Sequence, residues 1–424
     1  MKNMIDIYIK SDENYTNIVR YVLKIIEINQ SIQFNFIDNK NGAKWMWDHT
    51  DIESQVICLN FYSSVQNQIV DFNIDQHISF FNEYGRKDYI ASIFYKINCL
   101  QEFDEKAATD KYGRFTYSSS YQFKYQLIDK NLVQLEIDEF LSIKHVIGNK
   151  KKSRFYISHD IDTLYGSFLQ DGLWAVKNKK LGVIIRLIFN EVMQRPHWRN
   201  IDKILKISNE YDVYTTFFWL VNAGKGSFNI KNSDYSIKKE HALIRLVQQA
   251  ESFNGLHKSC SDDTFEQELE KCGFKTVFNR YHFLRFNTVE DWRKLSDSSI
   301  KLDCSLGFAE HYGFRNSYGK AFQPFDIVSN KPYDFIEAPL HFMDTTFHQY
   351  LKSNVNTIGT TVIDFFEKNN LNCDISLLWH NTFFTDYKYN SYLKEYKKIL
   401  CYIYENKIEV IRPLQLIEEN KLTW

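Results

Sequence analysis

The sequence predicts an α/β protein in which a distorted (β/α) barrel follows a small α/β domain. Beyond about residue 151, strand-like runs alternate with segments of helical periodicity, a pattern typical of parallel sheets and barrels. The chain has 424 residues, and two domains are the better expectation for that length. The segment 147–153, IGNKKKS, has the glycine, asparagine and lysines of a linker. We therefore divide the chain into 1–150 and 151–424.

The elements expected in the first domain follow from apolar periodicity. Clusters of β-branched and aromatic residues predict strands at 4–9, 31–38 and 55–62. Apolar residues at helical spacing predict helices at 14–29 and 88–103. Asn14 and Asp88 are the candidate N-caps of these helices. This domain offers no catalytic constellation, so we expect a structural or docking module.

The second domain is read in the same way. Its predicted helices are 171–193, 199–211, 236–251 and 262–274, the last capped by aspartate. Its predicted strands are 153–160, 213–220, 253–257, 281–286, 301–306, 334–340, 374–380 and 407–413. Because the chemistry of barrels sits where the strands end, the residues at these ends are the candidates for a site.

Composition excludes several classes of protein. Hydrophobic residues make up 44% of the chain, enough for a large core, and its few glycines and prolines argue against a disordered or collagen-like chain. A net charge of −1 gives no support to a nucleic-acid partner. Seven cysteines without a CxxC pair are typical of reduced thiols in the cytoplasm.

No targeting or transmembrane segment is expected. The N-terminus, MKNMIDIYIK, lacks the long apolar run of a signal peptide. The most apolar later segment, LGVIIRLIF at 181–189, is interrupted by Arg186 and is too short to span a bilayer. These features predict a soluble cytoplasmic protein, and they indicate no particular protein partner.

Histidines and aspartates gather at the predicted strand ends. The polar residues found there are His159, Asp160, Asp162, His257, Arg280, His282, Arg285, Asp303 and His380. A mixture of imidazole and carboxylate suits a zinc-type divalent cation with about three protein ligands and one open position. The spacings contain no HExxH and no compact zinc motif, and a single histidine at a strand end is more often structural.

Several of these segments resemble the polysaccharide deacetylase superfamily, whose NodB-homology fold is also called carbohydrate esterase family four. The resembling segments, in family order, are ISHDIDTLYGSFLQDGLW (157–174), GLHKS (255–259), NRYHFLRF (279–286), LDCSLGFAEHYGFR (302–315) and LLWHN (377–381). The resemblance covers about 155–412. DYIASIFY (88–95) and DKYGRF (110–115) resemble the uncharacterised N-terminal module that accompanies a subgroup of bacterial members.

The resemblance implies a metal site built on the first two motifs. In the family an acidic pair supplies one general base and one metal ligand, and Asp160 and Asp162 fit these roles. The usual pair is adjacent, so the intervening residue leaves the two roles exchangeable. His257 fits the first metal-binding histidine, but Ser261 stands where a second histidine is usual. We expect His282 to replace that ligand.

The resemblance also implies residues that assist the reaction. Arg280 fits an arginine that holds the base, since a guanidinium can donate two hydrogen bonds to one carboxylate; an ordinary surface ion pair is the alternative. His380, in the Leu-x-His motif, fits the general acid, and imidazole titrates near working pH. Asp303 resembles the carboxylate that orients this histidine, with a strand-end cap as the alternative. His159 is either a metal ligand or a residue that supports the ligands without binding the metal.

These roles imply a metal-dependent deacetylase that hydrolyses an N-acetyl group on a sugar or a polysaccharide precursor, with Zn²⁺ as the expected cation. The alternative is a catalytically inactive carbohydrate-binding or scaffold protein of polysaccharide biosynthesis, because the usual ligand set is incomplete. Aromatic residues that could stack on a sugar, or simply pack in the core, are Tyr165, Trp174, Trp219 and Trp379. The segment 306–326 is expected to be a long loop over the barrel mouth, where Arg315 either contacts an anionic group or is structural.

Overall fold

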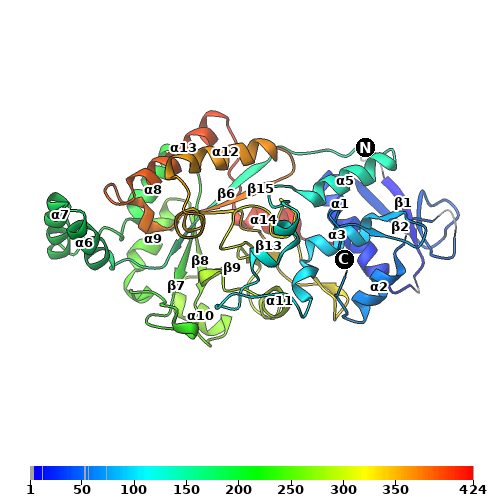
Figure 1. The fold of residues 1–424 in the computed structure, drawn as a ribbon, viewed down its shortest axis with the longest axis horizontal. Coiled ribbons are helices and arrows are strands. Elements are labelled where there is room, and N and C mark those ends of the chain that lie inside the picture. The colour runs from blue at the N-terminus through cyan, green and yellow to red at the C-terminus, as the bar shows by residue number, and fades with distance from the viewer. Residues whose placement is uncertain (1–3, 12, 52–53, 56, 73, 424) are drawn as a thin grey trace.

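The computed structural model describes residues 4–11, 13–51, 54–55, 57–72 and 74–423. Its elements before residue 147 form what we call the N-terminal module, which lies beside a larger barrel domain (Figure 1). The module has a three-stranded parallel sheet in the order β2–β1–β3, formed by β1 (Met4–Ile9), β2 (Gln33–Ile37) and β3 (Trp45–Trp47). A short antiparallel pair, β4 (Phe80–Phe81) and β5 (Lys87–Asp88), precedes its central helix.

The helices of the module pack their apolar faces into its core. They are α1 (Thr16–Gln30), α2 (Leu59–Gln66), α3 (Tyr89–Ile97), α4 (Tyr121–Lys124) and α5 (Leu132–Ile143). The cap predicted at Asp88 is confirmed, because its carboxylate accepts a hydrogen bond from the backbone N–H of Ala91 at 3.0 Å. The cap predicted at Asn14 is wrong, since α1 begins after Tyr15 without a side-chain cap.

The strand predicted at 55–62 is also wrong, with Val56 lying outside the described residues. The segment enters α2, where Phe61, Tyr62 and Val65 are buried on one side of the helix. A short apolar run is ambiguous between strand and helix, and tertiary packing decides between them here.

The barrel domain is built on an eight-stranded parallel sheet in the order β13–β10–β9–β8–β7–β6–β15–β14. Its strands are β6 (Arg154–Ile161), β7 (Thr216–Leu220), β8 (Phe253–Lys258), β9 (Phe278–Tyr281), β10 (Leu302–Asp303), β13 (Ile336–Glu337), β14 (Phe342–Met343) and β15 (Asp374–Leu378). All eight residues of β6 are buried, as expected for a strand covered on both faces.

The two edge strands of this sheet, β13 and β14, are consecutive in the chain. Only residues 338–341 join them, so their ends lie within about 17 Å of each other. The sheet must therefore curl until its edges nearly meet, although β13 and β14 do not pair within the part of the chain that the structure describes. The predicted fold class, a distorted (β/α) barrel behind a small α/β domain, is confirmed.

Helices connect the strands and cover the sheet. They are α6 (Ser167–Lys177), α7 (Leu181–Val192), α8 (Ile201–Glu210), α9 (His241–Gln249), α10 (Phe265–Cys272), α11 (Thr288–Ser296), α12 (Ile358–Lys368), α13 (Asn390–Glu405) and α14 (Pro413–Asn420). A small antiparallel pair, β11 (Phe325–Asp326) and β12 (Lys331–Pro332), lies outside the sheet.

Three predicted elements of this domain differ from the structure. The single helix expected at 171–193 is a hairpin of α6 and α7, because the chain turns at Lys179 with a φ of +54°. The strand expected at 281–286 ends at Tyr281, and one 3₁₀ turn follows. The strand expected at 407–413 contributes one isolated bridge, between Val410 and Phe155.

The segment 306–326 is irregular up to β11, as expected of a long loop, but it packs inside the protein. All of it except 310–312 is buried, and its backbone hydrogen-bonds to the N-terminal module through Phe314 N–H to Ile128 O at 2.8 Å. Arg315 is buried too and donates to both carboxylate oxygens of Glu102, at 2.9 and 2.7 Å. Arg315 is thus structural, and one hydrophobic core continues across both parts of the chain.

Candidate functional site

The end of β6 carries the two aspartates of the first motif. Side chains alternate between the faces of a strand, so Asp160 and Asp162 point to the same side while His159 points to the other. His159 is fully buried there, and its Nδ1 donates to the carbonyl of Trp379 at 2.7 Å. Burial lowers the pKa of His159 to about 4. Of the two alternatives given for His159, the role of a ligand is therefore excluded. The one-residue spacing of the aspartates follows from the pleat.

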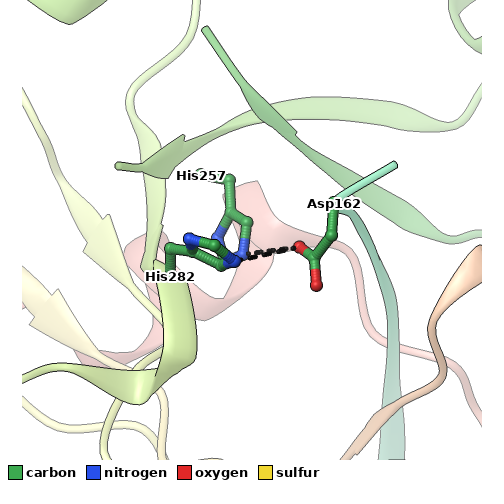
Figure 2. Close-up of side chains that lie close together, drawn as sticks. All are labelled: Asp162, His257 and His282. Atoms are coloured by element: carbon green, nitrogen blue, oxygen red, sulfur yellow. Dashed lines mark ion pairs between the residues drawn. The ribbon is translucent and has the colours of Figure 1, made fainter. Parts of the chain in front are cut away.

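Asp162, His257 and His282 lie together at the carboxyl ends of β6, β8 and β9 (Figure 2). One donor atom from each lies within 4.8 Å of the others. Asp162 Oδ1 is 3.3 Å from His257 Nε2 and 3.7 Å from His282 Nε2. His257 donates its Nδ1 proton to the carbonyl of Arg280 at 2.8 Å, which directs Nε2 toward the carboxylate.

This donor set fits a divalent cation. Two imidazole nitrogens and one carboxylate oxygen are zinc-type ligands, and three of them leave one position open. Asp162 Oδ1 is buried and receives no hydrogen bond from the described residues, so an electropositive partner is missing at that atom. Asp162, His257 and His282 would hold the cation.

The electrostatics of the cluster agree with a cation site. Burial acts to raise the pKa of Asp162, but His282, His257 and His380 outweigh it and the pKa lies well below its ordinary value. Burial also acts to lower the pKa of His257, yet the charges of Asp160 and Asp162 raise it overall. Two carboxylates in a buried position thus create a region that favours positive charge.

Asp160 is held by Arg280, and both side chains are buried. Arg280 donates from Nη1 to Asp160 Oδ1 at 2.8 Å and from Nε to the carbonyl of Cys304 at 2.9 Å, and its guanidinium stacks on Phe218. The pair makes one hydrogen bond rather than the two expected, because Nε bonds to the backbone. The surface ion pair given as the alternative for Arg280 is therefore excluded. The second oxygen of Asp160, Oδ2, faces His257 Nε2 at 3.5 Å.

His380 follows β15 and faces Asp162, with Nε2 at 3.7 Å from Asp162 Oδ2. Its orienting carboxylate is Asp344, whose Oδ1 accepts from His380 Nδ1 at 2.7 Å and whose Oδ2 accepts from the His380 backbone N–H at 2.6 Å. Burial alone would lower the pKa of His380, but Asp344 and the two aspartates of β6 raise it to about 10.

The prediction that Asp303 orients His380 is wrong. Asp303 ends β10, and the sheet order places β9, β8, β7 and β6 between β10 and β15. Asp344 directly follows β14, the neighbour of β15. Reading Phe-Met-Asp at 342–344 as another strand end would have found Asp344, but this run is too short to stand out in the sequence.

Asp303 instead belongs to a buried carboxyl pair. It accepts from the amide of Asn279 at 2.6 Å, and it lies opposite Glu337 in the register of β10 and β13. Burial raises the pKa of Asp303 to about 6 and the pKa of Glu337 well above its ordinary value. The folded chain therefore retains protons on this pair at pH values where the unfolded chain releases them.

We expect this pair to make the protein less stable as the pH rises through about 6. Relative to Glu337→Gln, the wild-type free energy of unfolding should fall as the pH rises from 4 to 7, because burial raises the pKa of Glu337 in the folded chain and the unfolded chain releases that proton at lower pH. Urea unfolding at several pH values measures the difference. The exposed Glu290→Gln should follow the wild type, and parallel curves for wild type and Glu337→Gln would refute the expectation.

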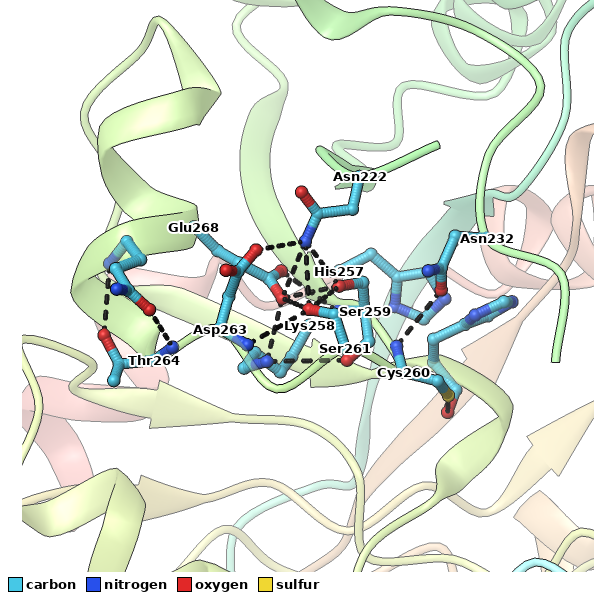
Figure 3. Close-up of polar contacts among 12 residues, drawn as sticks. Asn222, Asn232, His257, Lys258, Ser259, Cys260, Ser261, Asp263, Thr264 and Glu268 are labelled. Carbon is cyan, nitrogen blue, oxygen red and sulfur yellow. Dashed lines mark hydrogen bonds and ion pairs between the residues drawn. The ribbon is translucent and has the colours of Figure 1, made fainter. Parts of the chain in front are cut away.

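Ser261, at the position of the usual second histidine, is part of a polar network (Figure 3). Its hydroxyl donates to the fully buried Glu268 at 3.0 Å and accepts from the amide of Asn222 at the same distance. Lys258 pairs with Glu268 at 2.8 Å. The network fixes the turn after His257 without supplying a ligand, and the second imidazole of the cluster comes from His282 on the neighbouring strand.

The cluster opens into a cavity of about 100 Å³. Its polar wall is formed by Asp160, Asp162, His257, His282 and His380, and its apolar wall includes Leu284, Ala309 and Met343. A groove of about 720 Å³ begins at His282 on the outer side and runs past Lys258, Arg285 and Tyr112. The small cavity and the wider groove thus share His282 as a lining residue.

The N-terminal module contributes to this cavity through Arg114. Arg114 is held by Asp110, and it donates to the carbonyl of Phe283 at 2.8 Å and to the hydroxyl of Tyr350 at 3.1 Å. Phe283 and Leu284, directly after His282, have φ values of +63° and +49°, in the left-handed region that such residues seldom adopt. Arg114 therefore supports the strained turn beside a candidate ligand. No motif in the sequence indicates this contact.

The aromatic residues proposed for sugar stacking are only partly accessible. Trp219 and Trp379 are fully buried, and Trp219 Nε1 donates to Asn254 at 2.8 Å, so both serve the core. Trp174 packs against Tyr387. Tyr165 is exposed, but its hydroxyl bonds to Glu240. Of the two alternatives given for Trp219 and Trp379, packing in the core is therefore confirmed.

Comparison with known proteins gives distant matches. A family of unknown function, DUF7033, matches residues 7–146. No curated protein matches the chain. A Mycobacterium smegmatis structure named as a polysaccharide deacetylase is 13% identical, with a TM-score of 0.40 over 65% of this chain and 94% of that one. A mutant CE4 family pseudoenzyme with restored enzymatic activity is 11% identical, with a TM-score of 0.29 over 65% of this chain and 71% of that one.

Both structural likenesses are too distant to assign a function. The sequence motifs and the side chains of the site carry the proposal that follows. No helix among the described residues has both the length and the apolar character needed to cross a membrane.

Proposed function

We propose that this protein is a metal-dependent deacetylase that hydrolyses an N-acetyl group on a sugar or a polysaccharide precursor. The observation that carries the proposal is the convergence of Asp162, His257 and His282 within 4.8 Å, with Asp160 and His380 on either side. Its expected cation is Zn²⁺, which suits nitrogen and oxygen donors in a four-coordinate site with one open position.

A divalent cation bound there would polarise the acetyl carbonyl and lower the pKa of a bound water. Asp160 is the general base. Arg280 aims the carboxylate by donating to Oδ1, and the other oxygen, Oδ2, can accept the proton of the attacking water. His380 is the general acid. Asp344 holds its imidazolium, so Nε2 carries a proton that it can donate to the departing nitrogen.

The size of the cavity supports an acetyl group as the reacting part. A cavity of about 100 Å³ has room for an acetamide group beside the cluster. The sugar would lie in the adjoining groove, whose volume of about 720 Å³ is within the range of ordinary ligand sites. This division suits an N-acetylated glycan that presents only its acetyl group to the cluster.

A metal assay tests the proposal. We expect the purified chain to retain about one zinc ion per molecule, since three ligands and a water complete a catalytic site, and His257→Ala to lose it. His241→Ala, which changes an exposed histidine of α9, should keep the metal. Elemental analysis after gel filtration measures the stoichiometry.

Two results would oppose the proposal. Zinc content unchanged by His257→Ala would place the metal elsewhere. A metal-free protein that still binds N-acetylated glycans would favour the alternative of a non-catalytic carbohydrate-binding or scaffold protein.

A further inference from the structure

The α6–α7 hairpin leaves the barrel directly after the first motif. α6 begins at Ser167, a short turn beyond Asp162, and α7 returns toward the barrel. In Figure 1 the two helices project at the end of the molecule opposite the N-terminal module. They pack against each other, and α7 contains the most apolar segment of the sequence.

The outward side of α6 is apolar. Leu169, Leu173 and Val176 follow each other at i, i+4 and i+7, so they lie on one side of the helix. Each is at least 64% exposed. A helix that presents leucine and valine to solvent at this spacing lacks the partner surface that its pattern requires.

The outward side of α7 repeats the pattern. Leu181, Ile185, Ile188 and Val192 stand at i, i+4, i+7 and i+11, and each is at least half exposed. Together with the three residues of α6 they form what we call the outer face. Soluble proteins seldom expose a continuous apolar surface of this kind unless it binds something.

Polar residues fix the other side of the hairpin to the barrel. Asp171 accepts from the hydroxyl of Tyr387 at 2.6 Å and from Lys388 at 3.0 Å. Arg186 pairs with Asp386 and stacks on Tyr387. The hairpin is thus oriented by the barrel, and the outer face is the side that has no partner among the described residues.

The charges of the hairpin indicate what covers the outer face. Lys177, Lys179 and Lys180 are exposed at its tip. The only acids between 167 and 195 are Asp171, which is buried and paired, and Glu191. Apolar residues combined with lysines are the composition of helices that lie in the surface of an anionic bilayer. A second copy of the chain is the alternative occupant, and the test below distinguishes the two.

We propose that the outer face docks on an anionic lipid surface, with its apolar side chains among the acyl chains and the tip lysines at the headgroups. The helices lie in the interface and do not span the bilayer. Docking would hold the mouth of the candidate site close to the membrane, because Asp162 immediately precedes the hairpin. The proposal does not rest on the reaction proposed above, since vesicle binding is measured without a substrate.

The test is co-sedimentation of the full chain with vesicles of phosphatidylcholine alone or mixed with phosphatidylglycerol. We expect binding to the mixed vesicles that weakens as salt is added. Leu173→Glu with Ile185→Glu should reduce vesicle binding at least about tenfold, because two apolar side chains that would enter the acyl chains become charges. The matched control is Leu135→Glu with Ile143→Glu on α5, which are similarly exposed but distant, and it should bind like the wild type.

A second pair of variants tests the lysines. Changing Lys177, Lys179 and Lys180 to glutamine should weaken binding to mixed vesicles by about fivefold for each lysine. Changing Lys150, Lys151 and Lys152 to glutamine alters the net charge equally at another exposed run and should have little effect. Circular dichroism establishes that every variant is folded.

Three outcomes would overturn the proposal. The wild type could fail to bind mixed vesicles. The double variant on the outer face could bind as well as the wild type. The wild type could form a dimer that Leu173→Glu with Ile185→Glu dissociates, without any vesicle binding, which would assign the outer face to a second copy.

Discussion

Asparagine in place of Asp160 is expected to lower turnover about 100- to 10,000-fold, the usual contribution of a general base. The substitution keeps the shape of the side chain and an oxygen that can accept from Arg280, so the buried contact at 2.8 Å survives. What it removes is the basic oxygen that faces His257. Acetate released from an N-acetylglucosamine oligosaccharide measures the rate, and zinc content and thermal unfolding establish that the site is otherwise intact.

Asp303→Asn is the matched control for this experiment. Asp303 is also a buried aspartate at a strand end, but it lies on the far side of the sheet from His380 and bonds to Asn279. Its variant should keep most of the rate. Near-normal turnover in Asp160→Asn would show that another group is the base, and equal losses in both variants would mean that the effect is structural.

Truncating Arg315 to alanine is expected to destabilise the whole chain by about 3–5 kcal/mol, because it leaves the carboxylate of Glu102 buried without its charge partner. Both side chains are almost fully buried, and the two hydrogen bonds between them join the N-terminal module to the barrel domain. Urea unfolding, followed by fluorescence and by far-ultraviolet circular dichroism, measures the loss.

Two further variants test whether the destabilisation arises because the remaining charge is buried or because an ion pair is lost. Asp71→Ala breaks an ion pair with Lys106 that is similarly short, at 2.6 Å, but exposed, and it should destabilise the chain far less than Arg315→Ala. Glu102→Leu combined with Arg315→Met removes both buried charges, so it should be more stable than Arg315→Ala alone. An Arg315→Ala protein as stable as Asp71→Ala would contradict the role given to this pair.

The sequence predicted the parts of the site that depend on a single strand. Asp160 and Asp162 share a face because β-strands alternate, and His257 and His282 end strands that the sheet places next to each other. The order of neighbouring strands is a tertiary property, however. The sequence therefore indicates Asp303 as the partner of His380, because it does not show which strands are neighbours. In the structure β14 lies beside β15, and the chain places Asp344 next to His380.

Other features of the structure could not be decided from the sequence, for a different reason. Trp219 and Trp379 belong to continuous apolar strands, and nothing local distinguishes a tryptophan in a core from one at a binding surface. Segment 306–326 looks like a surface loop because it contains glycines and polar residues. It is buried because Arg315, Phe314 and their neighbours contact a module more than a hundred residues upstream.

The contact of Arg114 with Phe283 and Tyr350 has an evolutionary consequence. One wall of the candidate site is supplied by the N-terminal module, so recombination at 147–153 would change that wall. We therefore expect the two modules to be inherited together, and substitutions in the N-terminal module alone to alter the cavity while every candidate ligand is unchanged.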